Sequence, residues 1–237
     1  MTLKINYLNN KKASKKNNAI FVHLDTKISG INGDFDDKIK QKILSFLKKN
    51  KKTKENKIIS LNQDFDQRLI IILLAKTNDE LDSEKLGAKF FDFIKNNDVN
   101  DIYIKAPLFG NSKIKHNINF NSFIHGVELK SYEFNLYKTK KSSKVINLSV
   151  DKKDIVQKVK KLDSILDGVN FTRDLVSEPG NILHPDEYAK RLVKLKKYGL
   201  KVTVYDEKKL KKLGCNALLG VGQGSIRGSY LVTIEWK

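Results

Sequence analysis

Histidine, cysteine and clustered carboxylates are the side chains that bind metals or carry out acid–base and nucleophilic chemistry. The sequence contains four histidines and one cysteine: His23, His116, His125, His184 and Cys215. No two histidines have the spacing of a helical or loop metal motif, and one cysteine forms neither an internal disulfide nor a cysteine-cluster zinc site. We therefore interpret the histidines as structural or surface residues and the cysteine as a packed small side chain.

Three aspartates form the most regular carboxylate pattern. Asp163, Asp167 and Asp174 are four and seven residues apart, so they share one face of an expected helix. Carboxylates arranged in this way can hold a cation. The commoner arrangement is a solvated face, on which Arg173 and the neighbouring lysines offset the repulsion locally.

A glycine-rich stretch, residues 220–225, resembles a dinucleotide-binding loop in its glycine content. Such a loop needs a strand before it and a helix after it, so that the pyrophosphate meets the helix N-terminus. The residues that follow, 230–234, are β-branched and typical of a strand. We predict a tight connection between strands at 217–221 and 230–236, with close backbone packing at the glycines. The residue types alone thus provide no catalytic, substrate-binding or metal-binding candidate.

Composition limits the class of protein. The chain has 237 residues, enough for one large domain or two modest ones, and its 40% hydrophobic content excludes a wholly disordered chain. The longest apolar run, residues 69–75, is far shorter than the roughly 20 residues that span a bilayer. No apolar signal core follows Met1, and a single cysteine fits a reducing compartment. We therefore expect a cytoplasmic protein with no membrane partner.

The strong positive charge does not by itself identify a partner. Lys and Arg number 46 against 27 Asp and Glu, which gives a net charge of +19. Only four of the basic residues are arginines, the residue type whose guanidinium group forms bidentate hydrogen bonds with phosphates and base edges. The lysines are scattered and accompanied by many Asn and Ile residues, all encoded by A/T-rich codons. Nucleic acid is therefore not expected to be the main partner.

Hydrophobic periodicity predicts alternating strands and helices in the N-terminal part. Strands are expected at residues 3–8, 19–24, 68–75, 101–106 and 145–150. Helices are expected from residue 34 through Leu47, at 81–94 and at 120–129, and polar or charged connections at 11–18 and 48–56. This alternation favours an α/β fold with a mainly parallel, mixed sheet.

The C-terminal part begins with a long helix expected over residues 151–177, followed by a break at 178–181. A further helix begins at Pro185, which suits a first turn because it lacks an N–H, and Gly199 stops the helical stretch. A strand is expected at 201–205, and Asp206 caps a short helix that Gly214 ends.

Three segments, in this order and spacing, resemble the leucyl aminopeptidase (cytosol aminopeptidase) family of two-metal peptidases. Residues 126–141 contain the glycine, tyrosine, phenylalanine and tyrosine-lysine-threonine-lysine stretch that ends that family's N-terminal domain. Residues 172–185 resemble the arginine-aspartate-leucine, proline, asparagine, proline signature that opens its catalytic domain, and residues 213–225 resemble its glycine-rich turn. His184 departs from the family, which usually has a hydroxyl residue there, so a poorer helix cap is expected.

The resemblance implies a macro-like α/β domain at 1–150, a linker helix at 151–178 and the start of a peptidase catalytic domain at 179–237. It implies an aminopeptidase that releases N-terminal residues from peptide substrates, works as a cytoplasmic homo-hexamer and uses two divalent ions, manganese or zinc. These ions would activate a bridging water and stabilise the tetrahedral intermediate.

The family's metal ligands and catalytic lysine and arginine follow the strand that here ends near Trp236, and no position in this sequence matches them. The resemblance therefore implies a chain truncated before its site, with no catalytic, substrate-binding or metal residue carried over. We expect it to bind no metal, to be inactive alone, and to expose 230–236 as an interior strand without its next partners. Two alternatives remain. One is a macro-like nucleotide or nucleic-acid binding module, for which residues 30–33 are the phosphate-loop candidate, and the other is an assembly subunit without catalysis.

Overall fold

The computed structural model describes residues 2–8, 17–23, 36–64, 67–75, 78–105, 118–139, 144–151 and 160–236. The chain divides into two compact units, Met1–Asn170 and Phe171–Lys237, which are described separately. Of the polar connection expected at 11–18, residues 11–16 lie outside the described residues, and residues 17–18 begin a strand. The glycine pair at 30–33, the residues Asp34 and Phe35, His116 and residues 152–159 also lie outside the described residues.

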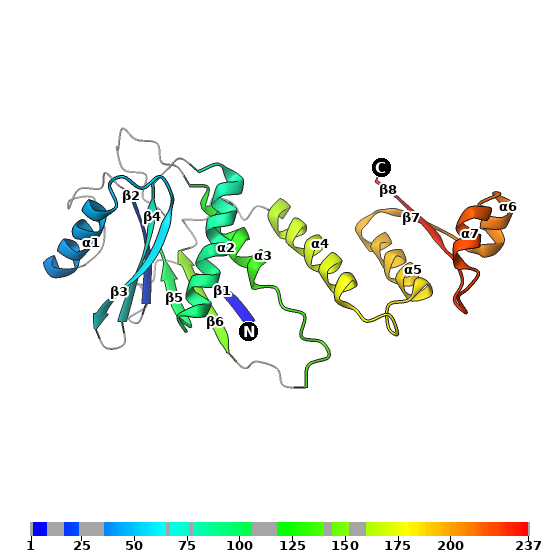
Figure 1. The fold of residues 1–237 in the computed structure, drawn as a ribbon, viewed down its shortest axis with the longest axis horizontal. Coiled ribbons are helices and arrows are strands. Elements are labelled where there is room, and N and C mark those ends of the chain that lie inside the picture. Colours follow the sequence, from blue (N-terminus) through cyan, green and yellow to red (C-terminus); the bar gives the residue numbers. More distant parts are fainter. Residues whose placement is uncertain are drawn as a thin grey trace. The chain divides into compact units, whose positions relative to one another are not determined.

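A six-stranded sheet forms the centre of the N-terminal unit (Figure 1). Its strands are β1 Thr2–Leu8, β2 Asn17–His23, β3 Lys57–Asp64, β4 Gln67–Leu74, β5 Asp101–Ile104 and β6 Val145–Asp151. Their order is β1-β6-β5-β2-β4-β3, and every neighbouring pair is parallel except β3 with β4. The prediction of an α/β fold with a mainly parallel, mixed sheet is therefore confirmed.

The buried strand β4 shows why this sequence forms a layered structure. All six residues from Leu69 to Leu74 are fully buried. Because successive side chains of a strand point to opposite faces, one half of the run packs in each of two hydrophobic clusters. A continuous apolar run is what a strand covered on both faces requires.

Helices cover both faces of the sheet. On one face, α1 (Asp37–Lys49) packs Ile39, Ile43 and Leu47 against β2 and β4. On the other, α2 (Glu80–Asn96) and α3 (Phe120–Ser131) pack against the larger cluster. Each helix begins at a residue whose side chain accepts a backbone N–H of the first turn: Asp36, Asp79 and Asn119. Such caps satisfy donors that have no partner within the helix.

The C-terminal unit contains short elements. Helix α4 (Lys160–Ser177) leads into it, followed by α5 (Pro185–Val193), the 3₁₀ helix η3 (Lys194–Tyr198), β7 (Lys201–Tyr205), α6 (Glu207–Lys212), α7 (Asn216–Gly222) and β8 (Leu231–Glu235). Pro185 lies in the first turn of α5, while Gly199 and Gly214 have φ of 83° and 73°, as expected of residues that end helices. Strands β7 and β8 pair antiparallel, from Lys201 with Glu235 to Tyr205 with Leu231.

One predicted strand is wrong. Residues 217–221 lie in helix α7, so β8 pairs with β7 and not with that segment. A short apolar run such as Ala217-Leu218-Leu219 is compatible with either conformation, and the turn at Gly214 lets Cys215 start a new helix. The helix expected over residues 151–177 begins later than predicted, because Asp151 is the last residue of β6 in the N-terminal unit, and the described part of that helix is α4.

Within the residues that the structure describes, no helix combines the length and apolar character needed to cross a bilayer.

Candidate functional site

The described histidines and the cysteine belong to different elements of the chain. His23 ends β2, His184 precedes α5 and Cys215 precedes α7. His184 forms no side-chain cap, which confirms the poorer cap predicted for this position. Across the described ranges, no group of three or more His, Cys, Asp or Glu side chains is placed to hold a metal ion.

His125 is a buried titratable residue of the N-terminal unit. Its side chain on α3 is 3% exposed, and its Nε2 lies 3.9 Å from Glu84 Oε2 on α2. Burial lowers the pKa of His125 below its usual value of 6.5, against the opposing effects of Glu84 and Asp163. His125 is therefore a neutral core residue, consistent with the structural role predicted for it.

We expect the low pKa of His125 to make the folded state pH-sensitive. As the pH is lowered, the unfolded chain takes up a proton on His125 near pH 6.5, whereas the folded chain takes it up only at its lower pKa. The folded state therefore loses stability as the pH is lowered through this window. The slope is at most about 1.4 kcal/mol per pH unit for one proton. Urea unfolding between pH 7 and 5 should show this slope, and His125→Asn should flatten it. An unchanged slope in the variant would assign the effect to other groups.

The aspartates of α4 form a mostly solvated face. Asp167 and Asp174 are exposed and Asp163 is half-buried. These carboxylates do not belong to any metal-holding group among the described residues. The solvated interpretation thus fits the exposed positions better than a cation site does.

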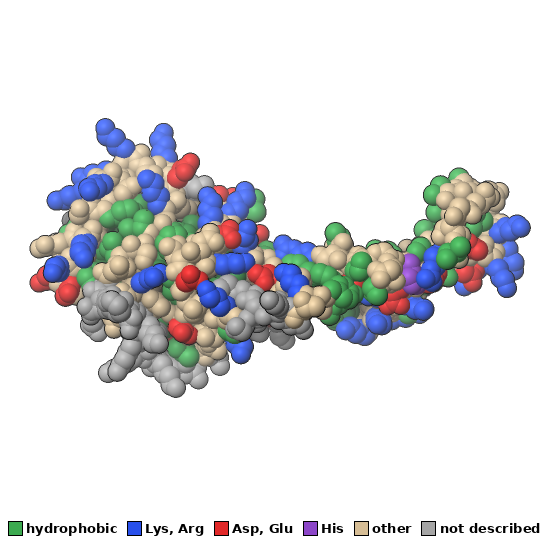
Figure 2. All heavy atoms as spheres, turned by 60° about the horizontal axis from the view of Figure 1, so that its bottom comes forward, with side chains coloured by type: hydrophobic (Ala, Val, Ile, Leu, Met, Phe, Trp, Pro, Cys, Tyr) green, Lys and Arg blue, Asp and Glu red, His purple; other side chains and the backbone are tan. Residues whose placement is uncertain are grey.

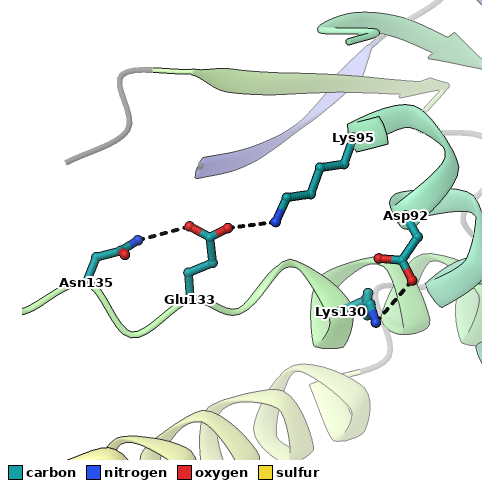
Figure 3. A network of polar contacts seen from close by, with 5 residues as sticks. All are labelled: Asp92, Lys95, Lys130, Glu133 and Asn135. Atoms are coloured by element: carbon teal, nitrogen blue, oxygen red, sulfur yellow. Dashed lines mark hydrogen bonds and ion pairs between the residues drawn. The ribbon is translucent and has the colours of Figure 1, made fainter. Parts of the chain in front are cut away.

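The first segment with family resemblance continues α3 and is fixed by ion pairs to α2 (Figure 3). Lys95 Nζ lies 2.9 Å from Glu133 Oε1, and Asn135 Nδ2 donates to Glu133 Oε2 at 3.1 Å. One turn away, Lys130 Nζ lies 3.0 Å from Asp92 Oδ2. These contacts hold the chain that leaves α3 along α2, which is a positioning role and not a reactive arrangement.

The second segment contains a well-buried ion pair. Glu178, just after α4, has a side chain only 4% exposed, and its Oε1 accepts from Arg191 Nη1 at 2.9 Å. Arg191 Nε also donates to Glu187 Oε1 at 3.3 Å within α5. The hydrogen bond with Glu178, reinforced by Glu187, raises the pKa of Arg191. The pair therefore fixes the turn at Pro179 against α5.

The residues that directly follow the third segment are held by Asp186 and Glu207. Asp186 Oδ2 accepts from Arg227 Nη1 at 3.3 Å and lies 3.3 Å from His184 Nδ1. A hydrogen bond with Asp186 is also the main cause that raises the pKa of Tyr230. Glu207 Oε1 accepts the backbone N–H of Ser229 at 3.1 Å. The residues after the glycine-rich stretch are thereby tied to α5 and α6.

Close packing at the glycine-rich stretch is present at one glycine. A Cβ on Gly222 would lie 2.0 Å from Ser229 Oγ, whereas a Cβ on Gly220 or on Gly224 would have no neighbour within 4 Å. The predicted close approach therefore applies to Gly222 alone. The stretch follows no phosphate-binding pattern, since its first three residues end helix α7 and strand β8 comes after it.

Sequence reasoning missed the ionic residues that hold the three segments. Glu178, Asp186, Arg191 and Arg227 have ordinary charged side chains with no diagnostic spacing. Their pairing joins residues up to 41 positions apart, which only the folded chain brings together.

The structure thus defines an α/β protein whose second unit contains two of the three segments that resemble a peptidase. The family model described as "Cytosol aminopeptidase family, catalytic domain" matches residues 170–237. A probable cytosol aminopeptidase of Rhizobium leguminosarum bv. trifolii is 35% identical over 182 residues, which is 72% of this chain and 36% of that protein. One from Phytoplasma mali is 44% identical over 125 residues, 49% of this chain and 25% of that protein.

Solved structures share the fold at low identity. A mutant of tomato leucine aminopeptidase has a TM-score of 0.68 at 18% identity, covering 99% of this chain and 50% of that one. The bottromycin maturation enzyme BotP in complex with Mn has a TM-score of 0.65 at 16% identity, covering 94% of this chain and 46% of that one. The chain spans half or less of the length of each protein named here. It belongs to the cytosol aminopeptidase family.

Proposed function

We propose that this chain forms part of a leucyl aminopeptidase, a metal-dependent exopeptidase that releases N-terminal amino acids from peptides. The match of residues 170–237 to the family's catalytic domain carries the proposal. The relative from Rhizobium extends the support beyond the C-terminal unit, because its 182 matched residues exceed the 67 residues of Phe171–Lys237.

The described residues do not fit a two-metal centre. They contain no group of three or more metal-binding side chains, and the acidic residues near the second and third segments are engaged with Arg191, Arg227 and backbone N–H groups. We therefore assign these residues to scaffolding of the catalytic domain. Two manganese or zinc ions belong, in this proposal, to other parts of the complete enzyme, and residues 1–237 alone have no metal-dependent peptidase activity.

The test compares the chain alone with a chimera. In the chimera, residues 1–237 are joined to the portion of the Rhizobium relative that follows the matched segment. We expect the chimera to hydrolyse leucine p-nitroanilide with manganese and to lose this activity with a chelator, and the 237-residue chain to show no such activity. Manganese-dependent hydrolysis by the chain alone would refute its inactivity. A folded chimera that hydrolyses nothing would refute the aminopeptidase assignment.

The assembly belongs to the same proposal. We propose that the complete enzyme is a cytoplasmic homo-hexamer, as the family resemblance implies. Light scattering of the folded chimera at several concentrations tests it, and a stable mass of one or two subunits would exclude the hexamer.

A further inference from the structure

A lysine-rimmed groove lies between α1 and the edge strand β3 in the N-terminal unit. Its volume is about 460 Å³. Its rim carries Lys38, Lys42 and Lys49, and its apolar lining is formed by Phe46, Ile59 and Leu61. Figure 2 shows hydrophobic side chains bordered by lysine and arginine side chains on this unit.

Every charged residue of the described chain that lines the groove is a lysine. The structure records no ion pair for Lys38, Lys42 or Lys49 within the described ranges, although Lys40 on the same helix pairs with Asp37 at 3.5 Å. Lys38 and Lys42 are one helical turn apart, and Lys49 continues the same side two turns later. Among the described residues, the rim therefore presents only positive charge along most of the helix.

The apolar lining is continuous with the core but remains accessible. Phe46, Ile59 and Leu61 are half-buried and pack against the cluster that α1 forms with β2 and β4. Among the described strands β3 pairs with β4 alone, so β3 is an edge strand of the sheet. Each apolar side chain that a partner inserted here would gain burial on top of the charge attraction.

We propose that this groove binds an acidic amphipathic peptide segment of another protein, with its apolar side chains on Phe46, Ile59 and Leu61. Its carboxylates then meet the three rim lysines. A nucleic acid fits less well, because the described lining residues include no arginine for bidentate hydrogen bonds with phosphates and a single aromatic ring for stacking. A flat bilayer fits less well, because the apolar residues are half-buried while the rim lysines are exposed. The proposal is independent of the peptidase activity.

The test uses the full 237-residue chain and a fluorescein-labelled peptide with leucines at i, i+3 and i+7 flanked by glutamates. Fluorescence anisotropy should show saturable binding. The triple variant Lys38→Glu/Lys42→Glu/Lys49→Glu should weaken it by about tenfold or more. The control Lys208→Glu/Lys211→Glu/Lys212→Glu makes the same charge change on the exposed face of α6 and should weaken it by less than about twofold. Leu61→Gln, which keeps all charges, should also weaken binding, and thermal unfolding monitors the fold of every variant.

Several results would overturn the proposal. Equal losses in the two triple variants would show attraction to net charge alone, and unchanged binding in Leu61→Gln would remove the apolar contact. A single-stranded oligonucleotide that bound more tightly, and was released by the rim variant only, would identify a nucleic-acid site. Tighter binding to anionic phospholipid vesicles would identify a membrane surface. Absence of peptide binding would refute it outright.

Discussion

Gly126→Ala is expected to destabilise the N-terminal unit by about 3 kcal/mol, near the upper end of what overpacking usually costs. A Cβ on Gly126 would lie 1.9 Å from the carbonyl oxygen of Glu84 and 2.7 Å from its carbonyl carbon. Both atoms belong to the backbone of α2, so no side-chain rotation relieves the clash. The two helices must move apart along a contact that is equally close at Gly87, where a Cβ would lie 1.9 Å from Phe123 O.

Gly168→Ala provides the matched control for that substitution. Gly168 also lies inside a helix, α4, but a Cβ there meets nothing within 4 Å. Alanine should therefore stabilise this helix by up to about 1 kcal/mol through its higher helix propensity. Urea titrations followed by circular dichroism measure both variants. If Gly126→Ala unfolds at the same urea concentration as the wild type, α2 and α3 do not pack through these glycines.

The sequence carries enough information to predict the layers of the N-terminal unit. The apolar run at 69–74 identifies a strand buried on both faces, and the spacing of Ile39, Ile43 and Leu47 identifies the covering face of α1. These signals are strong because burial selects the residue type at every position of such an element. The parallel arrangement then follows from the alternation of strands and helices.

Strand β3 and helix α7 show where such reasoning stops. In β3 the apolar residues Ile58 and Ile59 are adjacent, and the alternation typical of a half-buried strand is confined to residues 59–62. Its strand conformation comes from pairing with β4, a contact that a local pattern does not contain. In α7 the run of apolar and glycine residues is too short to distinguish a helix from a strand.

The candidate site divides in the same way. The three segments with family resemblance were found from their residues, and the comparisons confirm the family. The contacts that hold those segments, such as Glu178 with Arg191 and Asp186 with Arg227, depend on the folded chain. Because a buried carboxylate is stable only with a partner, Glu178 needs Arg191 wherever this turn forms.

Phe123→Ala is expected to cost 3 to 5 kcal/mol, roughly the range for removing a buried phenylalanine. Phe123 is fully buried, and its ring lies 5.2 Å from that of Phe21 and 5.5 Å from that of Phe90, centroid to centroid. These rings come from a strand and two helices, so the cavity would open at the centre of the larger cluster. Phe134→Ala serves as the control. The ring of Phe134 is half-buried and, among the described ring pairs, contacts only Tyr137, so its removal should cost about 1 kcal/mol. Chemical denaturation gives both values, and similar losses in the two variants would contradict a core centred on Phe123.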